Sequence, residues 1–149
     1  MVWKTLNNQK NVPIRNTPYL VAVHFGDDEI DYENICIMIG RYNGIAWEIV
    51  DSQDRMRITN NSDCKILAFM PLPSAIQNTV RKPENYGQYL VYIKYGGRKN
   101  YRRMIGIYHA DMWYLGDLQS PIRIHPEDIS DIRIATLPKL SRGEYIGGI

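Results

Sequence analysis

Arginine, lysine and tyrosine side chains alternate through one short stretch in the second half of this 149-residue chain. Guanidinium groups bind phosphate and carboxylate through paired hydrogen bonds, and aromatic rings stack on bases or on guanidinium planes. The pair Gly96-Gly97 would let backbone N–H groups approach an anion. The sequence therefore predicts a surface that binds an anionic ligand. The predicted ligand-binding residues are Arg98, Lys99, Tyr101, Arg102, Arg103, Tyr92, Tyr95 and Tyr108.

The same stretch also fits a simpler interpretation. Gly-Gly suits a tight hairpin turn, in which the backbone needs positive φ. Lysine and arginine beside such a turn keep it soluble and protect the edge of a sheet from pairing with another chain. Both interpretations stay open at the level of the sequence.

A second charged stretch, residues 26–34, carries five carboxylates and no base. Alternating carboxylates are typical of calcium loops, but the glycine at the sixth position is missing and Met38 stands where the twelfth-position glutamate would be. We therefore expect no metal site. A solvated loop is the simplest interpretation; alternatively, the acidic loop of one chain binds the basic stretch of another, a heterologous contact. The predicted interface residues are Asp27, Asp28, Glu29, Asp31 and Glu33.

Residues suited to catalysis are scattered along the chain. His24, His109 and His125 lack the spacing of a helical zinc pair, and there is no G-x-S-x-G, Walker A, G-x-G-x-x-G or Cys-x-x-Cys motif. Cys36 lies in an apolar run, which predicts an inert core thiol, and Cys64 is expected in a loop. We expect a protein that is not an enzyme and needs no cofactor.

Composition limits the remaining classes. Hydrophobic residues make up 44% and charged residues 23%, as in soluble globular proteins. The longest apolar run is much shorter than the roughly 20 residues that span a bilayer, and the first eight residues show no secretion signal. We therefore expect a cytoplasmic protein without membrane contacts. The net charge of +2 argues against general coating of DNA.

The chain contains an internal repeat. Met38-Ile39-Gly40-Arg41-Tyr42 precedes Trp47 with the same spacing as Met104-Ile105-Gly106-Ile107-Tyr108 precedes Trp113. Further matches join Pro13 to Pro83, Tyr19-Leu20-Val21 to Tyr89-Leu90-Val91, Arg57-Ile58 to Arg123-Ile124, and Ala68 and Pro71 to Ala135 and Pro138. We interpret these matches as a tandem duplication.

Each copy has the pattern of short β-strands and lacks a sustained helical period. Expected strands cover residues 19–25, 35–42, 46–50, 56–59 and 65–70 in the first copy, and 88–95, 102–108, 112–116, 122–125 and 131–136 in the second. Asn43-Gly44 predicts a type I′ hairpin turn with positive φ at both residues. His109 is expected in the corresponding turn, and residues 125–129 favour a single helical turn.

The predicted fold class is all-β, a tandem duplication of a small antiparallel five-strand unit of SH3-like or meander type. Because about 60 residues bury a marginal core alone, we expect the two copies to pack against each other or against a second chain. The predicted domains are residues 1–73, with the acidic loop, and 88–149, with the basic stretch and a C-terminal tail; residues 74–87 form the linker. Trp47 and Trp113 are expected in the core, with Gly40 and Gly106 approaching their rings.

The first copy shows a further pattern. Its members are Trp3, Pro13, Tyr19-Leu20-Val21, Trp47 and Met70-Pro71-Leu72-Pro73. Over residues 3–73 this order resembles a family of small phage and prophage domains of unknown function, although the Pro-Val step common near the first tryptophan is absent. The second copy keeps Tyr89-Leu90-Val91, Trp113 and Leu137-Pro138. The resemblance implies an origin in a mobile element and accessory work, and it brings no catalytic residues.

Three functions are compatible with these observations. The first is a non-catalytic phage or prophage accessory protein that counters a host defence system by stoichiometric binding of an enzyme or of its nucleotide signal, in the host cytoplasm. The second is a small-barrel protein that binds single-stranded nucleic acid by base stacking. The third is an assembly protein that forms homo-oligomers through its acidic and basic loops.

Overall fold

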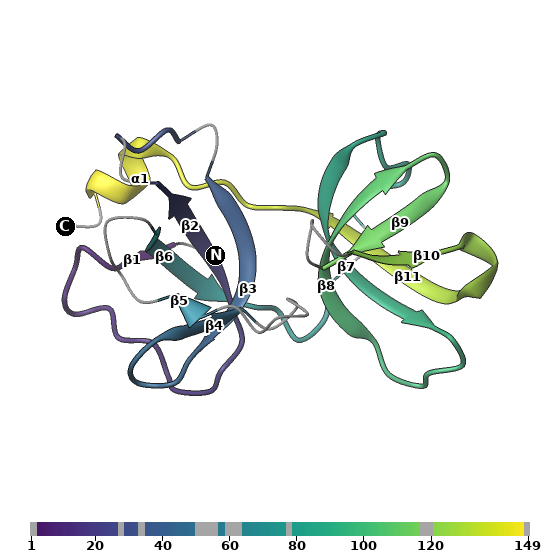
Figure 1. Cartoon of the computed structure of the whole chain (residues 1–149), viewed down its shortest axis with the longest axis horizontal. Helices are drawn as coiled ribbons and strands as arrows, with labels where there is room; N and C mark the ends of the chain where they lie inside the picture. Colours follow the sequence, from purple (N-terminus) through teal and green to yellow (C-terminus); the bar gives the residue numbers. More distant parts are fainter. Residues whose placement is uncertain are drawn as a thin grey trace. The chain divides into compact units, whose positions relative to one another are not determined.

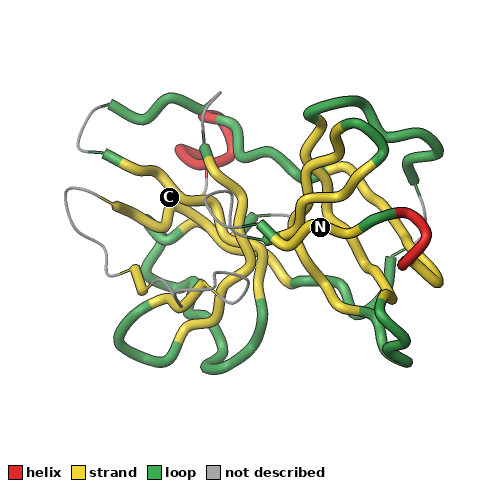
Figure 2. The backbone as a smooth tube through the Cα atoms, turned by 45° about the vertical axis from the view of Figure 1, so that its right-hand side comes forward, coloured by secondary structure: helices red, strands yellow, loops and turns green. Residues whose placement is uncertain are grey.

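The computed structural model is composed of antiparallel β-sheets with very little helix (Figures 1 and 2). It describes residues 3–26, 29–32, 35–49, 57–58, 64–76, 79–116 and 121–147. The described residues form two compact units: the first holds those up to 49, from 57 to 72 and from 138 onward, and the second holds those from 73 to 137. The prediction of an all-β duplication is confirmed.

The first unit is built on a six-stranded sheet with the order β1-β6-β2-β3-β4-β5. Its strands are β1 (Lys4–Thr5), β2 (Tyr19–Phe25), β3 (Cys36–Tyr42), β4 (Trp47–Ile49), β5 (Arg57–Ile58) and β6 (Cys64–Pro71). Strands β2 to β5 form a meander, and β6 returns to pair with β2. The short strand β1, which the sequence pattern does not predict, pairs with β6 at the edge.

The second unit repeats this arrangement in a five-stranded sheet with the order β10-β9-β8-β7-β11. Its elements are β7 (Gly87–Tyr95), β8 (Arg102–His109), β9 (Met112–Leu115), β10 (Ile122–Ile124), the 3-10 turn η1 (Pro126–Asp128) and β11 (Ile129–Thr136). The turn η1 lies where the sequence predicts a single helical turn. A meander whose last strand returns to the first through a 3-10 turn is an SH3-like unit.

The two units agree in register as well as in strand order. Tyr19 pairs with Gly40, and Tyr89 pairs with Gly106. The hydroxyl of each tyrosine accepts a hydrogen bond from the backbone N–H five residues earlier, at 3.0 Å for Ile14 and 2.9 Å for Glu84. Because both the pairing and this hydrogen bond recur, positions in one unit can be equated with positions in the other.

The expected alignment of the last strands is wrong by two residues. Ala68 pairs with Ala22, whose equivalent Tyr92 pairs with Arg133, so Ala68 corresponds to Arg133 and not to Ala135. A shift of two residues keeps every side chain on the same face of a sheet. The alternation of apolar residues therefore fits both alignments, and only the pairing distinguishes them.

Each unit has a hydrophobic core of its own, and the two tryptophans lie in these cores as predicted. Trp47 and Trp113 are each 4% exposed. Trp113 packs edge-on to Tyr89 with 6.0 Å between the ring centroids, and Trp47 packs edge-on to Tyr19 with 6.1 Å between them. The expected close approach of glycine to the ring holds at Gly106, where an added Cβ atom would lie 3.2 Å from Trp113 Cε3. At Gly40 the three nearest atoms would belong to Glu48, Val21 and Ile49, at 3.3–3.6 Å, and none of them to the Trp47 ring.

The hairpin turns between the second and third strands of the meanders differ from the prediction. In the turn between β3 and β4, only Gly44 has positive φ, because the Asn43 side chain accepts hydrogen bonds from the N–H groups of Ile45 and Ala46 and closes a four-residue loop. In the second unit Ala110 and Asp111 both have positive φ, at 50° and 63°, and form a two-residue turn. His109 is therefore the last residue of β8 and lies outside the turn.

The C-terminal tail packs on the first unit, whereas the expected division grouped it with the second repeat. Trp3 Nε1 donates a hydrogen bond to the carbonyl of Lys139 at 3.1 Å, and Leu140 is 2% exposed. The tail ends in a short helix, α1 (Arg142–Gly147). Its six residues are too few to show a helical period in the sequence. A capping box marks its start, because Ser141 and Glu144 each accept a hydrogen bond from the other's backbone N–H.

Candidate anion-binding site

Strand alternation divides the predicted ligand-binding residues between the two faces of the second sheet. Tyr89, Val91 and Ile93 of β7 point into the core of the unit. Tyr92 and Lys94 alternate with these residues and therefore lie on the opposite face, called here the outer face. The cross-strand neighbours that share the outer face are Arg103, opposite Tyr92 on β8, Arg133, opposite Tyr92 on β11, and Asp131, opposite Lys94 on β11.

The side chain of Tyr101 contacts several of these charged groups. Lys94 Nζ lies 4.5 Å from the ring centroid, and the Arg133 guanidinium carbon lies 5.9 Å from it. The Tyr101 hydroxyl donates a hydrogen bond to the Asp131 carboxylate. The outer-face cluster, defined as Lys94, Arg103 and Arg133 with Tyr92, Tyr101 and Asp131, thus brings three cations and one carboxylate together.

Tyr92 anchors the middle of the cluster. Its side chain is 2% exposed, and its hydroxyl donates a hydrogen bond to the carbonyl of Pro73. Burial raises the pKa of Tyr92, while the charge of Arg103 and its hydrogen bond to the phenol lower that pKa in part. The phenol is therefore neutral at physiological pH and serves to hold the Arg103 guanidinium in place.

A separate group, called here the turn cluster, comprises Tyr95, Arg98 and Arg102. Arg102 Nη1 donates a hydrogen bond to the Tyr95 hydroxyl at 2.8 Å, and the Arg98 guanidinium carbon lies 5.4 Å from the Tyr95 ring centroid. Tyr95 packs against the core cluster, and Arg102 pairs with a core-facing residue. These side chains therefore do not share the outer face with Arg103.

The glycine pair forms a hairpin turn, as the simpler interpretation predicts. Gly96 and Gly97 have φ of 60° and 75°. The N–H of Gly96 donates to the carbonyl of Asp128 at 3.2 Å, and the N–H of Arg98 donates to the carbonyl of Tyr95 at 3.2 Å. Because the N–H groups of Gly96 and Arg98 are bonded within the protein, these two groups are not directed at an anion.

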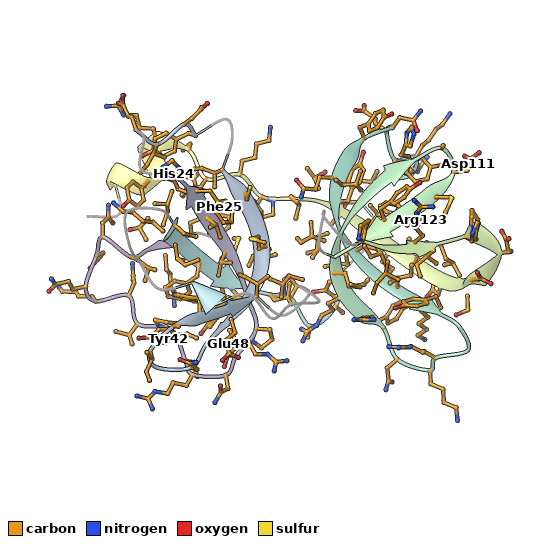
Figure 3. All side chains as sticks on the ribbon, in the orientation of Figure 1. His24, Phe25, Tyr42, Glu48, Asp111 and Arg123 are labelled. Carbon is orange, nitrogen blue, oxygen red and sulfur yellow. The ribbon has the colours of Figure 1, made fainter. Side chains whose placement is uncertain are left out.

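Two further predicted residues lie apart from the outer-face cluster. Lys99 is exposed in the loop after the turn. Tyr108 is near the other end of β8, where its hydroxyl donates a hydrogen bond to Asp111 at 2.9 Å and its ring lies 5.2 Å from that of Trp113. The hydrogen bond to the Asp111 carboxylate raises the pKa of Tyr108. Figure 3 labels Asp111 in the second unit.

Sequence reasoning missed Lys94, Asp131 and Arg133. Lys94 is two residues after Tyr92, so alternation within the strand could have placed both on one face. Arg133 comes from the last strand, and its neighbours depend on how β11 pairs with β7. The expected alignment of the last strands equates Ala68 with Ala135 and would therefore put Ala135 in the place opposite Tyr92 that Arg133 holds.

The equivalent positions of the first unit have a different character. The row Arg133, Tyr92 and Arg103 corresponds there to Ala68, Ala22 and Ile37. These three residues are 0%, 0% and 8% exposed. One copy of the duplication therefore carries charge in a row that is apolar and buried in the other.

The predicted acidic interface is only partly within the described residues. Asp27, Asp28 and Glu33 lie outside them, while Glu29 and Asp31 are exposed. Within the described parts of the chain, no group of three or more His, Cys, Asp or Glu residues is arranged to hold a metal ion.

The cysteines differ from expectation in their placement. Cys36 is the first residue of β3 and lies beyond the buried part of the strand. It is exposed, and the prediction of a core thiol is therefore wrong. Cys64 begins β6 and does not lie in a loop. The two strands flank β2, whose end carries His24 and Phe25 (Figure 3). Burial raises the pKa of both thiols, and the proximity of Cys36 raises that of Cys64 further.

In comparison with known proteins, no protein-family model, curated protein or solved structure matches the chain. Among the residues that the structure describes, no helix has the length and apolar character needed to cross a membrane.

Proposed function

We propose that the protein is a non-catalytic binding protein whose outer-face cluster holds an anionic, phosphate-bearing ligand. The observation that carries this proposal is the position of Lys94 and Arg133 around the Tyr101 ring, beside an Arg103 held by Tyr92. Cationic side chains that aromatic groups already hold in place lose less conformational freedom when they bind an anion. Arginine adds paired hydrogen bonds to phosphate oxygens.

The tyrosines favour this function over the stacking of nucleic-acid bases. Tyr92 is buried, Tyr95 contacts two arginines, Tyr101 contacts Lys94 and Arg133, and Tyr108 is bonded to a carboxylate. A stacking surface needs ring faces that a base can cover. Here the rings support cations, and the cations would make the contacts.

The resemblance of residues 3–73 to phage and prophage domains supports a biological setting for the proposal. In that setting the ligand is a nucleotide signal of a host defence system in the host cytoplasm. A protein without catalytic groups would remove such a signal by stoichiometric binding, and the ligand would be released from the complex with its mass unchanged.

Two matched triple variants test the location of the site. Lys94→Gln/Arg103→Gln/Arg133→Gln removes three charges from the outer face, and Arg98→Gln/Lys99→Gln/Arg102→Gln removes three from the neighbouring turn. Calorimetry with ADP and with pyrophosphate should show at least tenfold weaker binding for the outer-face variant and less than threefold for the turn variant. Thermal melts establish that both variants are folded.

The opposite ranking, or no binding of either probe to the native protein in low salt, contradicts the proposal. A dT15 oligonucleotide provides the comparison with nucleic acid. If dT15 binds more tightly than ADP, with an affinity that falls steeply as salt rises, the protein binds single strands instead.

A further inference from the structure

The first unit exposes three aliphatic side chains on two adjacent loops. Val12 is 73%, Ile14 is 69% and Ile45 is 85% exposed. The N–H of Asn16 donates to the carbonyl of Tyr42 at 2.9 Å, which joins the loop before β2 to the loop between β3 and β4. These three residues are called here the aliphatic patch, and Figure 3 labels Tyr42 and Glu48, which flank the second loop.

The duplication supplies an internal control for this patch. The loop before β7 has the same backbone as the loop before β2: Asn16 and its equivalent Tyr86 have φ of 61° and 63°, and both donate to the carbonyl at the end of the next strand. By these equivalences the patch residues Val12 and Ile14 correspond to Lys82 and Glu84 of the second unit. The loop before the first long strand thus carries two charges in one unit and two aliphatic groups in the other on the same backbone, whereas Ile45 lies in a turn whose backbone differs between the units.

Exposed aliphatic groups on a loop that folds equally well with charged ones are not explained by the stability of the loop. Contiguous exposed apolar groups mark interaction sites on soluble proteins. The second unit carries charge at the positions of Val12 and Ile14, and the exposed ring on its loop, Tyr86, stacks on His109 of the same unit. The difference therefore points to a contact that the first unit makes and the second does not.

Two cations on the loop of Val12 and Ile14 indicate the partner. Lys10 and Arg15 are exposed, and the Arg15 guanidinium lies beside Gly44 of the second loop, so close that an added Cβ atom would be 2.8 Å from its carbon. In a symmetric contact between two copies, each patch would face itself and bring these cations together, which is unfavourable. A partner with carboxylates around an apolar segment complements both the charge and the apolar surface.

We infer that the aliphatic patch of Val12, Ile14 and Ile45 binds an acidic, apolar segment of another protein. The patch supplies the apolar contact, and the two cations orient the carboxylates of the partner. This site belongs to the first unit and is independent of the outer-face cluster in the second.

A transplanted variant, Val12→Lys/Ile14→Glu/Ile45→Asp, tests the inference. Its first two substitutions install the residues that the second unit carries at the same positions, and its third places a charge on the neighbouring loop. The control is Lys82→Glu/Glu84→Lys, which changes charge on the equivalent loop. A displayed library of random 16-residue peptides is selected on the native protein. Enriched peptides should combine apolar residues with an excess of Asp and Glu, and their dissociation constants should rise at least tenfold with the transplanted variant and less than twofold with the control.

Three results would overturn the inference: no enrichment on the native protein, enriched peptides with an excess of Lys and Arg, or peptides that bind the transplanted variant equally well. Sedimentation and flotation with phosphatidylglycerol vesicles identify the other occupants. A self-association or a vesicle binding that the transplanted variant alone abolishes would assign the patch to a second copy or to a lipid surface, and would also refute the acidic segment.

Discussion

Gly106 and Gly40 hold equivalent positions but have different neighbours. An added Cβ atom at Gly106 would lie 2.7 Å from Leu115 Cδ2 and 3.1 Å from Val91 Cγ2, whereas at Gly40 no atom would be nearer than 3.3 Å. We predict that Gly106→Ala lowers the free energy of unfolding by about 1–3 kcal/mol, as overpacking does, and that Gly40→Ala costs less. Urea unfolding measures both. Equal costs would show that the core around Trp113 adapts freely.

Tyr92 and Arg103 make a prediction about pH. Because burial raises the pKa of Tyr92 above its ordinary value of about 10, the unfolded chain loses this proton first, and the fold loses stability as the pH rises from about 10 through the folded pKa. Arg103→Gln removes a group that lowers this pKa. We expect the pKa of Tyr92 to rise further, measured by carbon NMR of the tyrosine ring, and alkaline stability to fall more steeply. A lowered pKa would contradict the contact between the two residues.

At the scale of the element, the turn between β8 and β9 stores strain. Ala110 has φ of 50°, in a region that costs an ordinary L-residue about 1–2 kcal/mol. Asparagine tolerates this conformation and is preferred in type I′ turns. Ala110→Asn should therefore raise the free energy of unfolding by about 0.5–1 kcal/mol, measured by urea unfolding. A loss of stability would mean that the turn has another backbone.

Most of the elements could be predicted because local rules determine them. Alternating apolar residues indicate the strands, and Trp47 and Trp113 with their equal spacing indicate the duplication. The site could be predicted only in part. Alternation along β8 separates Arg102 from Arg103, but the register of β11 against β7 decides that Arg133 lies in one row with Arg103. A pattern with a period of two does not determine that register.

At the scale of the whole molecule, the first unit depends on the end of the chain. Leu140 is 2% exposed within it, although the last strand of the second unit ends at Thr136. We predict that Leu140→Ala destabilises the first unit by about 2–5 kcal/mol, and that Lys139→Ala, at an exposed position, changes stability by less than about 0.5 kcal/mol.

Hydrogen exchange distinguishes the two units in this experiment. In Leu140→Ala the amides of β6 should exchange faster, and those of β7 should keep their native rates. Faster exchange in β7 alone would place the tail with the second unit. The same variant should leave pyrophosphate binding within twofold of native, since the outer-face cluster belongs to the other unit.

The binding of an anion by the outer-face cluster is tested most directly by NMR titration of the native protein with pyrophosphate. We predict that the largest shifts occur at the backbone amides of Lys94, Arg103 and Arg133 and at the arginine side-chain N–H groups, and that they saturate together with one dissociation constant. Shifts centred on residues 96–99 of the turn, or no saturable shift at low salt, would contradict the account.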